Sequence, residues 1–198
     1  MKKLSPVLAL SLATLSACGG GATGPSPAAP PAGKVITWSG SALRTTRTQA
    51  GVLDSNIRWE VTNLTWVEDD GEVSGLGSDV LYRIGSGHVV QTIEQHVGPC
   101  VAVAQTEYDL RPADGKLIVG PGRYSGSINE RGEHPLHVIA DCGFGGAAAL
   151  LADSLELPID SAVDTTRSAS RLRGTQTVTA AASTLTASWD LTATAWAR

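Results

Sequence analysis

The sequence predicts an all-β domain, built either as a single antiparallel β-sandwich or as a barrel of about nine strands. From residue 34 onward, apolar and polar residues alternate with a period of two, and Val, Ile, Thr and Trp dominate the alternating segments. Gly, Pro and Asp-Gly pairs separate these segments, as they do at turns between strands. No linker interrupts residues 34–198, so we expect one domain there.

About nine segments show this alternation, and each is expected to form a strand. They are residues 35–48, 56–68, 78–84, 88–97, 100–110, 116–128, 134–142, 171–181 and 184–197. Turn signals such as Gly85-Ser86-Gly87 and Gly120-Pro121-Gly122 lie among them. Residues 146–153 differ, because their Ala-rich composition allows a short helix.

Composition and charge limit the class of protein. Apolar residues make up 42% of the 198 residues, which is enough to bury a single hydrophobic core. The formal net charge is −4, which excludes a nucleic-acid-binding protein that works by neutralising phosphates.

The first eighteen residues have the pattern of a targeting signal. Lys2 and Lys3 precede an apolar run, residues 6–15, which is too short to span a bilayer and is typical of a signal peptide. The run ends in Leu15-Ser16-Ala17-Cys18, which resembles the lipobox of bacterial lipoproteins. The resemblance implies cleavage before Cys18, acylation of its thiol and anchoring in the cell envelope. Gly19 after the cysteine implies the outer membrane if the host is Gram-negative.

Three regions follow from this pattern: a signal peptide at residues 1–17, a lipidated cysteine with a Gly/Pro/Ala tether at residues 18–33, and the all-β domain at residues 34–198. The domain also resembles uncharacterised secreted β-proteins of bacteria in its scattered Trp residues, its Tyr124–Ser127 segment and its paired cysteines. That resemblance implies no activity.

Cys100 and Cys142 remain once Cys18 is assigned to acylation. Each shares its strand face with apolar residues, and an exported protein folds in an oxidising compartment. We therefore expect one structural disulfide between Cys100 and Cys142.

Strand parity places Trp59 and Trp189 on the core face of their strands. Trp66 and Trp196 lie seven residues later, so the same parity places them on the more polar face. Exposed indoles stack on sugar rings or sit at interfaces, which makes Trp66 and Trp196 candidate ligand contacts.

The segments around these tryptophans, residues 59–66 and 189–196, also resemble each other. A second match, between residues 41–47 and 161–167, precedes them in the same order. Two explanations remain open: an internal duplication, or convergence of Thr-rich strands on similar composition.

Four residues are candidates for a metal site: Glu94, His96, His134 and His137. They share one ion only if their strands pair suitably, and solvated histidines are the alternative. His88 is too far from His96 along an extended strand to join such a site. We expect neither a metal nor another cofactor.

No spacing in the sequence specifies a nucleophile or a phosphate-binding loop. The basic cluster Arg167, Arg171 and Arg173 suits acidic glycans or lipid headgroups, or else a solvated hairpin.

The sequence therefore predicts a non-catalytic cell-envelope lipoprotein. Its partners would be the membrane, through the lipid anchor, and an envelope protein, a glycan or a small ligand. Two alternatives stay open: a lipocalin-like carrier of a small apolar ligand, with Trp59 and Trp189 lining its lumen, and an envelope hydrolase whose dyad is assembled across strands.

Overall fold

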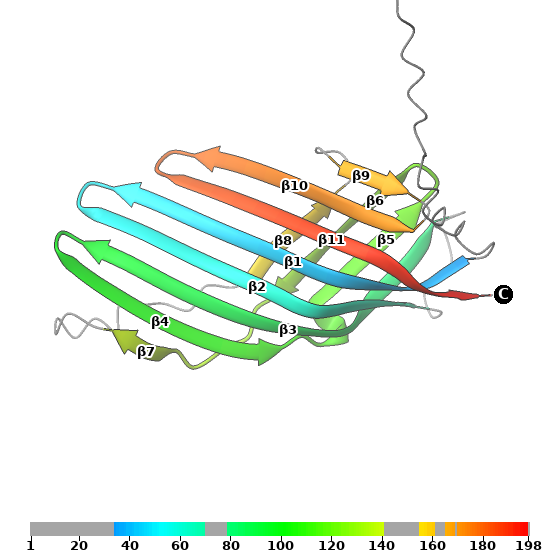
Figure 1. The fold of residues 1–198 in the computed structure, drawn as a ribbon, viewed down its shortest axis with the longest axis horizontal. Helices are drawn as coiled ribbons and strands as arrows, with labels where there is room; N and C mark the ends of the chain where they lie inside the picture. The colour runs from blue at the N-terminus through cyan, green and yellow to red at the C-terminus, as the bar shows by residue number, and fades with distance from the viewer. Residues whose placement is uncertain (1–33, 70–78, 141–154, 161–164, 169, 198) are drawn as a thin grey trace, which may run out of the picture.

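A computed structural model describes residues 34–69, 79–140, 155–160, 165–168 and 170–197 (Figure 1). The expected signal peptide, Cys18 and the tether lie outside the described residues, as do the expected helix at 146–153 and Cys142. The described elements are β1 (Lys34–Ala50), β2 (Leu53–Glu68), β3 (Val80–Val97), β4 (Cys100–Asp109), a 3-10 turn η1 (Pro112–Asp114), β5 (Gly115–Gly120), β6 (Arg123–Glu130), β7 (His137–Ala140), β8 (Leu155–Asp160), β9 (Thr165–Ser168), β10 (Arg171–Ala180) and β11 (Ser183–Ala197). The predicted all-β class is confirmed.

These strands form one antiparallel sheet in the order β8-β6-β5-β3-β2-β1-β11-β10-β9. The sheet divides at β3, whose residues Val80–Arg83 pair with β5 while His88–Val97 pair with β4. β7 in turn pairs with β4. In Figure 1, β4, β3, β2, β1, β11 and β10 lie side by side, and β5, β6 and β8 lie behind them. The sheet thus curls back on itself as a nearly closed barrel.

The core lies between the long strands and the returning strands β5, β6 and β8. We call the side of each strand that faces this core its inner face and the other side its outer face. The largest fully buried side chains are Trp59, Trp66, Tyr82, Tyr124, Leu64, Ile84, Ile93, Leu117, Ile128, Leu155, Leu157 and Ile159. Aromatic rings bury large areas, so these few residues supply much of the hydrophobic stabilisation.

Polar contacts of the tyrosines tie the two sides of the barrel together. The indole Nε1 of Trp189 on β11 donates a hydrogen bond to Tyr124 Oη on β6, at 3.0 Å. Tyr124 Oη donates to the carbonyl oxygen of Arg173 on β10 at 3.3 Å. Tyr82 Oη on β3 donates to the carbonyl oxygen of Val35 on β1 at 2.7 Å. Each bond satisfies a polar atom that the core would otherwise leave unpaired.

The predicted strands 78–84 and 88–97 form one strand, β3, instead of a hairpin. The segment Gly85-Ser86-Gly87 continues the strand and does not form a turn. Glycine is needed at its two ends because neighbouring side chains approach the backbone closely. A Cβ at Gly85 would lie 2.7 Å from Val67 Cγ2, and a Cβ at Gly87 would lie 2.9 Å from Leu110 Cδ1.

Other predicted bounds also change. Residues 116–128 are divided between β5 and β6 by the turn that contains Gly122, which has a φ of 79°. The segment 134–142 contributes the short strand β7. The strands β8 and β9 were not expected from the sequence.

The expectation that Trp66 faces the polar side is wrong, because Trp66 has no exposed surface. Asn63 adopts a left-handed backbone conformation with a φ of 51°, and the β2–β3 register shifts between Thr62 and Trp66. This irregularity reverses the alternation, so that Leu64 and Trp66 join Trp59 in the core. The same shift leaves Val67, which has the same strand parity as the buried Trp59, 44% exposed.

Cys100 is disulfide-bonded, and its partner lies outside the described residues. The pairing with Cys142 therefore stays a prediction. In the part of the chain that the structure describes, no helix has the length and hydropathy of a membrane span.

The two matched pairs of segments, 41–47 with 59–66 and 161–167 with 189–196, are arranged differently in the sheet. The 41–47 segment lies in β1, which pairs directly with β2 and its Trp59. In the other pair, Thr165–Ser168 form β9, and β10 separates β9 from β11 and its Trp189. The strand order therefore does not repeat in the way that a duplicated strand pair would.

Candidate functional site

A groove opens where the core ends, between β8 and the hairpin formed by β10 and β11. We call it the inner groove, and its cavity volume is about 480 Å³. It is lined by Thr46, Ser127, Asn129, Glu156, Leu157, Pro158, Val178, Ala180, Ser183 and Leu185. This volume lies within the range of roughly 300–1,000 Å³ found for small-ligand sites.

The strand alternation explains why the inner groove is apolar. On β11, Ala187, Trp189 and Leu191 point into the core, and Leu185 continues the same face toward the hairpin turn. On β10, Val178 lies directly opposite Leu185. Leu185 packs against the core, whereas Val178 is 47% exposed. Toward the hairpin turn, the inner face of β10 and β11 thus extends beyond the strands that cover the core. The apolar side chains on this part of the hairpin remain accessible.

Polar groups of the inner groove lie among these apolar residues. The Oγ1 atom of Thr46 is buried and has no hydrogen-bond partner among the described residues. Glu156 brings one carboxylate, and no Lys, Arg or His is among the described residues of the lining.

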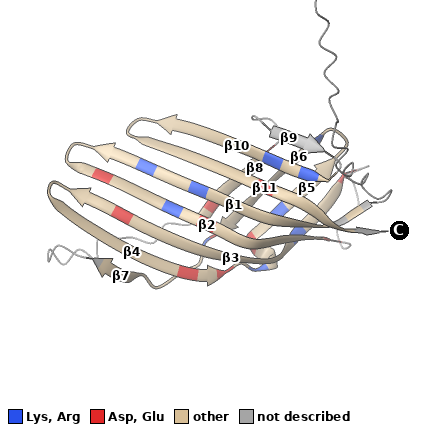
Figure 2. Ribbon diagram, viewed as in Figure 1, with Lys and Arg blue, Asp and Glu red and all other residues tan. Residues whose placement is uncertain are grey.

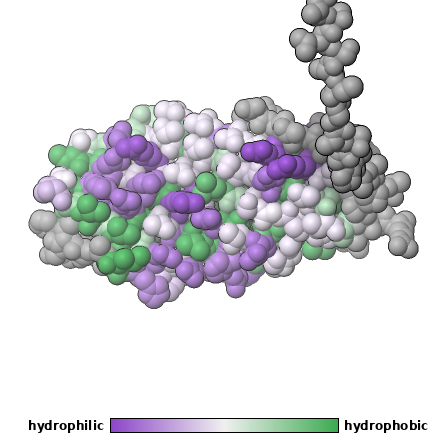
Figure 3. All heavy atoms as spheres, in the orientation of Figure 1, coloured by the Kyte–Doolittle hydropathy of each residue, from purple (hydrophilic) through white to green (hydrophobic). Residues whose placement is uncertain are grey.

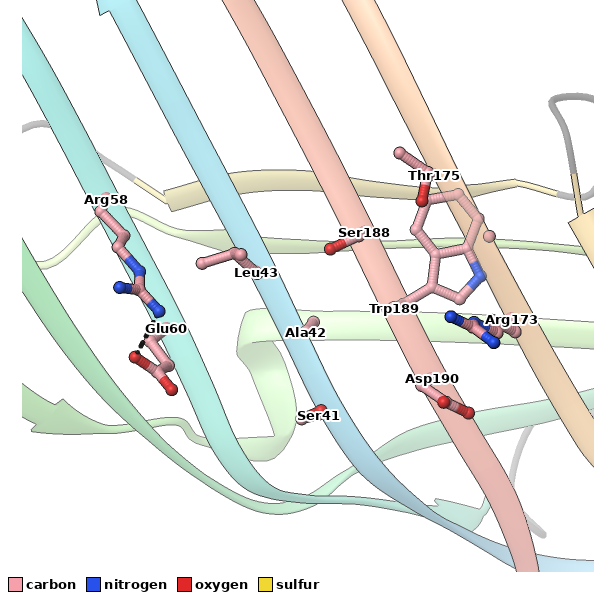
Figure 4. Close-up of a pocket in the computed structure, with 11 residues that line it drawn as sticks. Ser41, Ala42, Leu43, Arg58, Glu60, Arg173, Thr175, Ser188, Trp189 and Asp190 are labelled. Atoms are coloured by element: carbon pink, nitrogen blue, oxygen red, sulfur yellow. Dashed lines mark hydrogen bonds and ion pairs between the residues drawn. The ribbon is translucent and has the colours of Figure 1, made fainter.

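A second depression lies on the outer face, across β10, β11, β1 and β2 (Figure 4). We call it the outer hollow, and its cavity volume is about 390 Å³. It is lined by Ser41, Ala42, Leu43, Arg58, Glu60, Arg173, Gly174, Thr175, Ser188, Trp189 and Asp190. Figure 2 shows basic residues on β10, β1 and β2 of this face, and Figure 3 shows hydrophilic residues gathered over the same strands.

Ion pairs organise the charges of the outer face. Arg58 Nη2 lies 2.9 Å from Glu60 Oε2, and Arg171 binds both carboxylate oxygens of Asp190 at 2.8 and 2.5 Å. The hydrogen bonds from Arg171, together with the positive charges of Arg171 and Arg173, lower the pKa of Asp190. Asp190 is therefore a firmly ionised carboxylate.

Glu94 and His96, two of the candidate metal ligands, lie together on the outer face of β3. His96 Nε2 is 2.6 Å from Glu94 Oε1, and both residues line a third depression with Asp54. Asp54 is held by Arg47 Nη2 at 2.9 Å, which lowers its pKa. This arrangement is that of polar side chains paired at the surface.

His134 lies elsewhere, against the inner side of β4. Its ring stacks on Tyr108 with a centroid distance of 3.7 Å, and its Nε2 lies 3.1 Å from Glu130 Oε1. His137 begins β7 opposite Gln105. The four candidates are thus not brought together, because Glu94 and His96 lie on the outer face of β3 whereas His134, between β6 and β7, lies against the inner side of β4. Within the described residues, no group of three or more His, Cys, Asp or Glu side chains has the arrangement of a metal site.

The tryptophan candidates fare differently. Trp66 is buried and is not available as a surface contact. The backbone of Trp196 pairs with Val35, and its side chain lies outside the described part of the chain. Trp59 and Trp189 are buried in the core and do not line an open lumen.

Sequence reasoning did not find the inner groove. Two of its residues, Val178 and Leu185, are apolar and lie in strands that the sequence predicts. The opposite wall of the groove comes from β8, which the sequence did not indicate. The sequence places Arg173 in a basic cluster but does not show which residues lie beside it in the sheet.

Comparisons with family models, with curated proteins and with solved structures found no match to this chain. The proposal that follows therefore depends on the residues and on their geometry.

Proposed function

We propose that this chain is a non-catalytic, lipid-anchored protein of the bacterial cell envelope, whose β-domain binds a small apolar ligand in the inner groove. Lys2, Lys3, the apolar run and Cys18 support the anchor, since they resemble the signal peptide and lipobox of bacterial lipoproteins. The anchor would hold the domain near lipids, where small apolar molecules are abundant.

The observation that carries the proposal is the inner groove itself. Leu157, Pro158, Val178, Ala180 and Leu185 form an apolar lining within a volume suited to one small molecule. An apolar ligand placed there would remove Val178 from water, which is favourable by about 25 cal/mol per Å² of apolar surface.

The polar atoms of the groove limit the class of ligand. Glu156 is the one charged residue among the described lining residues, so an anion such as a fatty acid would meet a carboxylate and no compensating cation. Thr46, Ser127 and Asn129 offer hydroxyl and amide groups to an uncharged polar end. The ligand is therefore an uncharged molecule with an apolar body and one polar end.

Among the lining residues that the structure describes, Glu156 has no second acid or base as a neighbour, which favours binding without catalysis.

A fluorescence titration tests the proposal. The full chain would carry Cys18→Ser, which removes the acylation target, and would be purified without detergent. The uncharged probe N-phenyl-1-naphthylamine should bind saturably, and its fluorescence should fall when decanol is added, more than with decanoate.

Val178→Glu should weaken probe binding about tenfold or more, because it places a charge in the apolar lining. Thr177→Glu is the matched control, since Thr177 lies next to Val178 on β10 and points to the other face. Equal binding by the parent chain and Val178→Glu, with both folded by circular dichroism, would overturn the assignment of the groove.

A further inference from the structure

Two arginines compete for one carboxylate at the edge of the outer hollow. Arg173 on β10 lies directly opposite Asp190 on β11 in the sheet register. Both oxygens of Asp190 are nevertheless bound by Arg171, the diagonal neighbour, through Nε at 2.8 Å and Nη2 at 2.5 Å. The side chain of Arg173 makes no ion pair within the described residues. It acts on Asp190 only through its positive charge, which lowers the pKa of that carboxylate.

Among the described residues, no side chain accepts a hydrogen bond from the guanidinium of Arg173. Arg173 is exposed and lines the outer hollow, and Figure 4 shows its guanidinium close to Asp190. A guanidinium presents parallel N–H groups that match the two oxygens of a carboxylate. The positive charge of Arg171 is already neutralised by Asp190, so Arg173 gives the site its net attraction for an anion.

Hydroxyl groups continue the outer hollow away from Arg173. Ser41 and Arg173 both pair with Asp190, one on each side of β11, and Thr175 and Leu43 both pair with Ser188 in the same way. Thr175, Ser188 and Leu43 thus form one row across the three strands, and Ser41 lies diagonally opposite Ser188, in the row of Asp190 and Arg173. The Arg58–Glu60 pair closes the far side.

We propose that the outer hollow binds an acidic saccharide, with Arg173 holding its carboxylate and the hydroxyls of Ser41, Thr175 and Ser188 bonding to its hydroxyl groups. A sugar ring that carries one carboxylate fits Arg173 better than a phosphate does. The carboxylates of Asp190 and Glu60 would repel the two charges that a phosphate dianion holds on one group more strongly than the single charge on one sugar ring. This site goes beyond the inner groove, because it lies on the opposite face of the sheet and takes a different ligand.

Isothermal titration calorimetry on the full Cys18→Ser chain tests the proposal, with trigalacturonic acid as the probe. Maltotriose and inorganic phosphate are the comparison ligands, and they separate the carboxylate from the sugar ring and from charge alone. We expect trigalacturonic acid to bind, with an affinity that falls as salt is raised, and we expect the other two to bind at least tenfold more weakly.

Arg173→Gln should weaken the binding of trigalacturonic acid about tenfold or more, as expected when a hydrogen bond to a charged group is lost. Arg47→Gln is the matched control, because Arg47 lies on the outer face of β1, is paired with Asp54 and does not line the hollow. Its affinity should equal that of the parent chain.

Two further variants distinguish a binding role from a structural one. Asp190→Asn removes the competing carboxylate and should strengthen binding severalfold. Arg171→Gln should weaken binding, although Arg171 does not line the hollow, because Asp190 is then free to pair with Arg173. Unchanged binding by folded Arg173→Gln, or weaker binding by folded Asp190→Asn, would overturn the proposal. Equal binding of phosphate and trigalacturonic acid would also overturn it, because it would show a general anion site.

Discussion

At the scale of single residues, Tyr108 stands out because its hydroxyl is buried without a hydrogen-bond partner among the described residues. Burial raises the pKa of Tyr108 far above its ordinary value, and the negative charges of Glu130 and Asp114 add to the effect. Arg44, whose guanidinium lies 4.4 Å from the Trp59 ring centroid, partly offsets it. The phenol thus stays neutral inside a charged cluster.

Tyr108→Phe should therefore stabilise the domain by about 1 kcal/mol at pH 7, since it removes a buried hydroxyl that has no hydrogen-bond partner among the described residues and keeps the stacking on His134. The gain should grow above pH 10. There the unfolded chain loses the Tyr108 proton while the folded chain keeps it, so the parent chain becomes less stable as pH rises. Urea unfolding at pH 7 and at pH 11 measures both effects. A loss of stability at pH 7 would show that the hydroxyl has a partner.

At the scale of elements, the irregularity in β2 decides which residues fill the core. The left-handed conformation of Asn63 shifts the alternation that sets Leu64 and Trp66 inside the barrel. Ser86 Oγ donates to the Asn63 carbonyl oxygen at 3.1 Å and fixes the shift against β3. One residue therefore determines the orientation of a fully buried tryptophan.

Asn63→Val should destabilise the domain by about 1–2 kcal/mol or more, because a β-branched residue is strained at a positive φ. Asn63→Gly should leave stability within about 0.5 kcal/mol, because glycine adopts this conformation freely. Thermal unfolding of both variants provides the measurement. If Asn63→Val were as stable as Asn63→Gly, the backbone conformation would not be what holds Trp66 in place.

The same element shows where prediction from sequence succeeds and where it stops. Alternation alone places Trp59 and Trp189 correctly in the core, because their strands are regular around them. It fails at Trp66, since Asn63 is a residue type that tolerates a positive φ but does not require one, and alternation alone gives no sign of the irregularity. The inner groove escapes prediction for a related reason: β8, which supplies Leu157, is distant in sequence from the hairpin that carries Leu185. Periodicity describes one strand, whereas a site depends on which strands meet.

At the scale of the whole molecule, the bridge at Cys100 links the start of β4 to a second cysteine. If that partner is Cys142, the Cys18→Ser chain has no free thiol, and the additional change Cys142→Ser exposes one. Loss of the bridge should lower the free energy of unfolding by about 2–4 kcal/mol. Thiol titration and urea unfolding of both chains test this. Two free thiols in the Cys18→Ser chain, purified from an oxidising compartment, would contradict it.

The place of β1 has a mechanical consequence. β1 is hydrogen-bonded on one side to β2 and on the other to β11, along most of its length, and Lys34 pairs with Ala197 at the end where the tether would join. Tension on a membrane anchor would pull β1 along its own axis. Both ladders would then be loaded in shear, so that many hydrogen bonds bear the force together and do not open one at a time. An envelope protein built in this way would resist the forces of a moving or swelling cell surface through this geometry, independently of the size of its folding free energy.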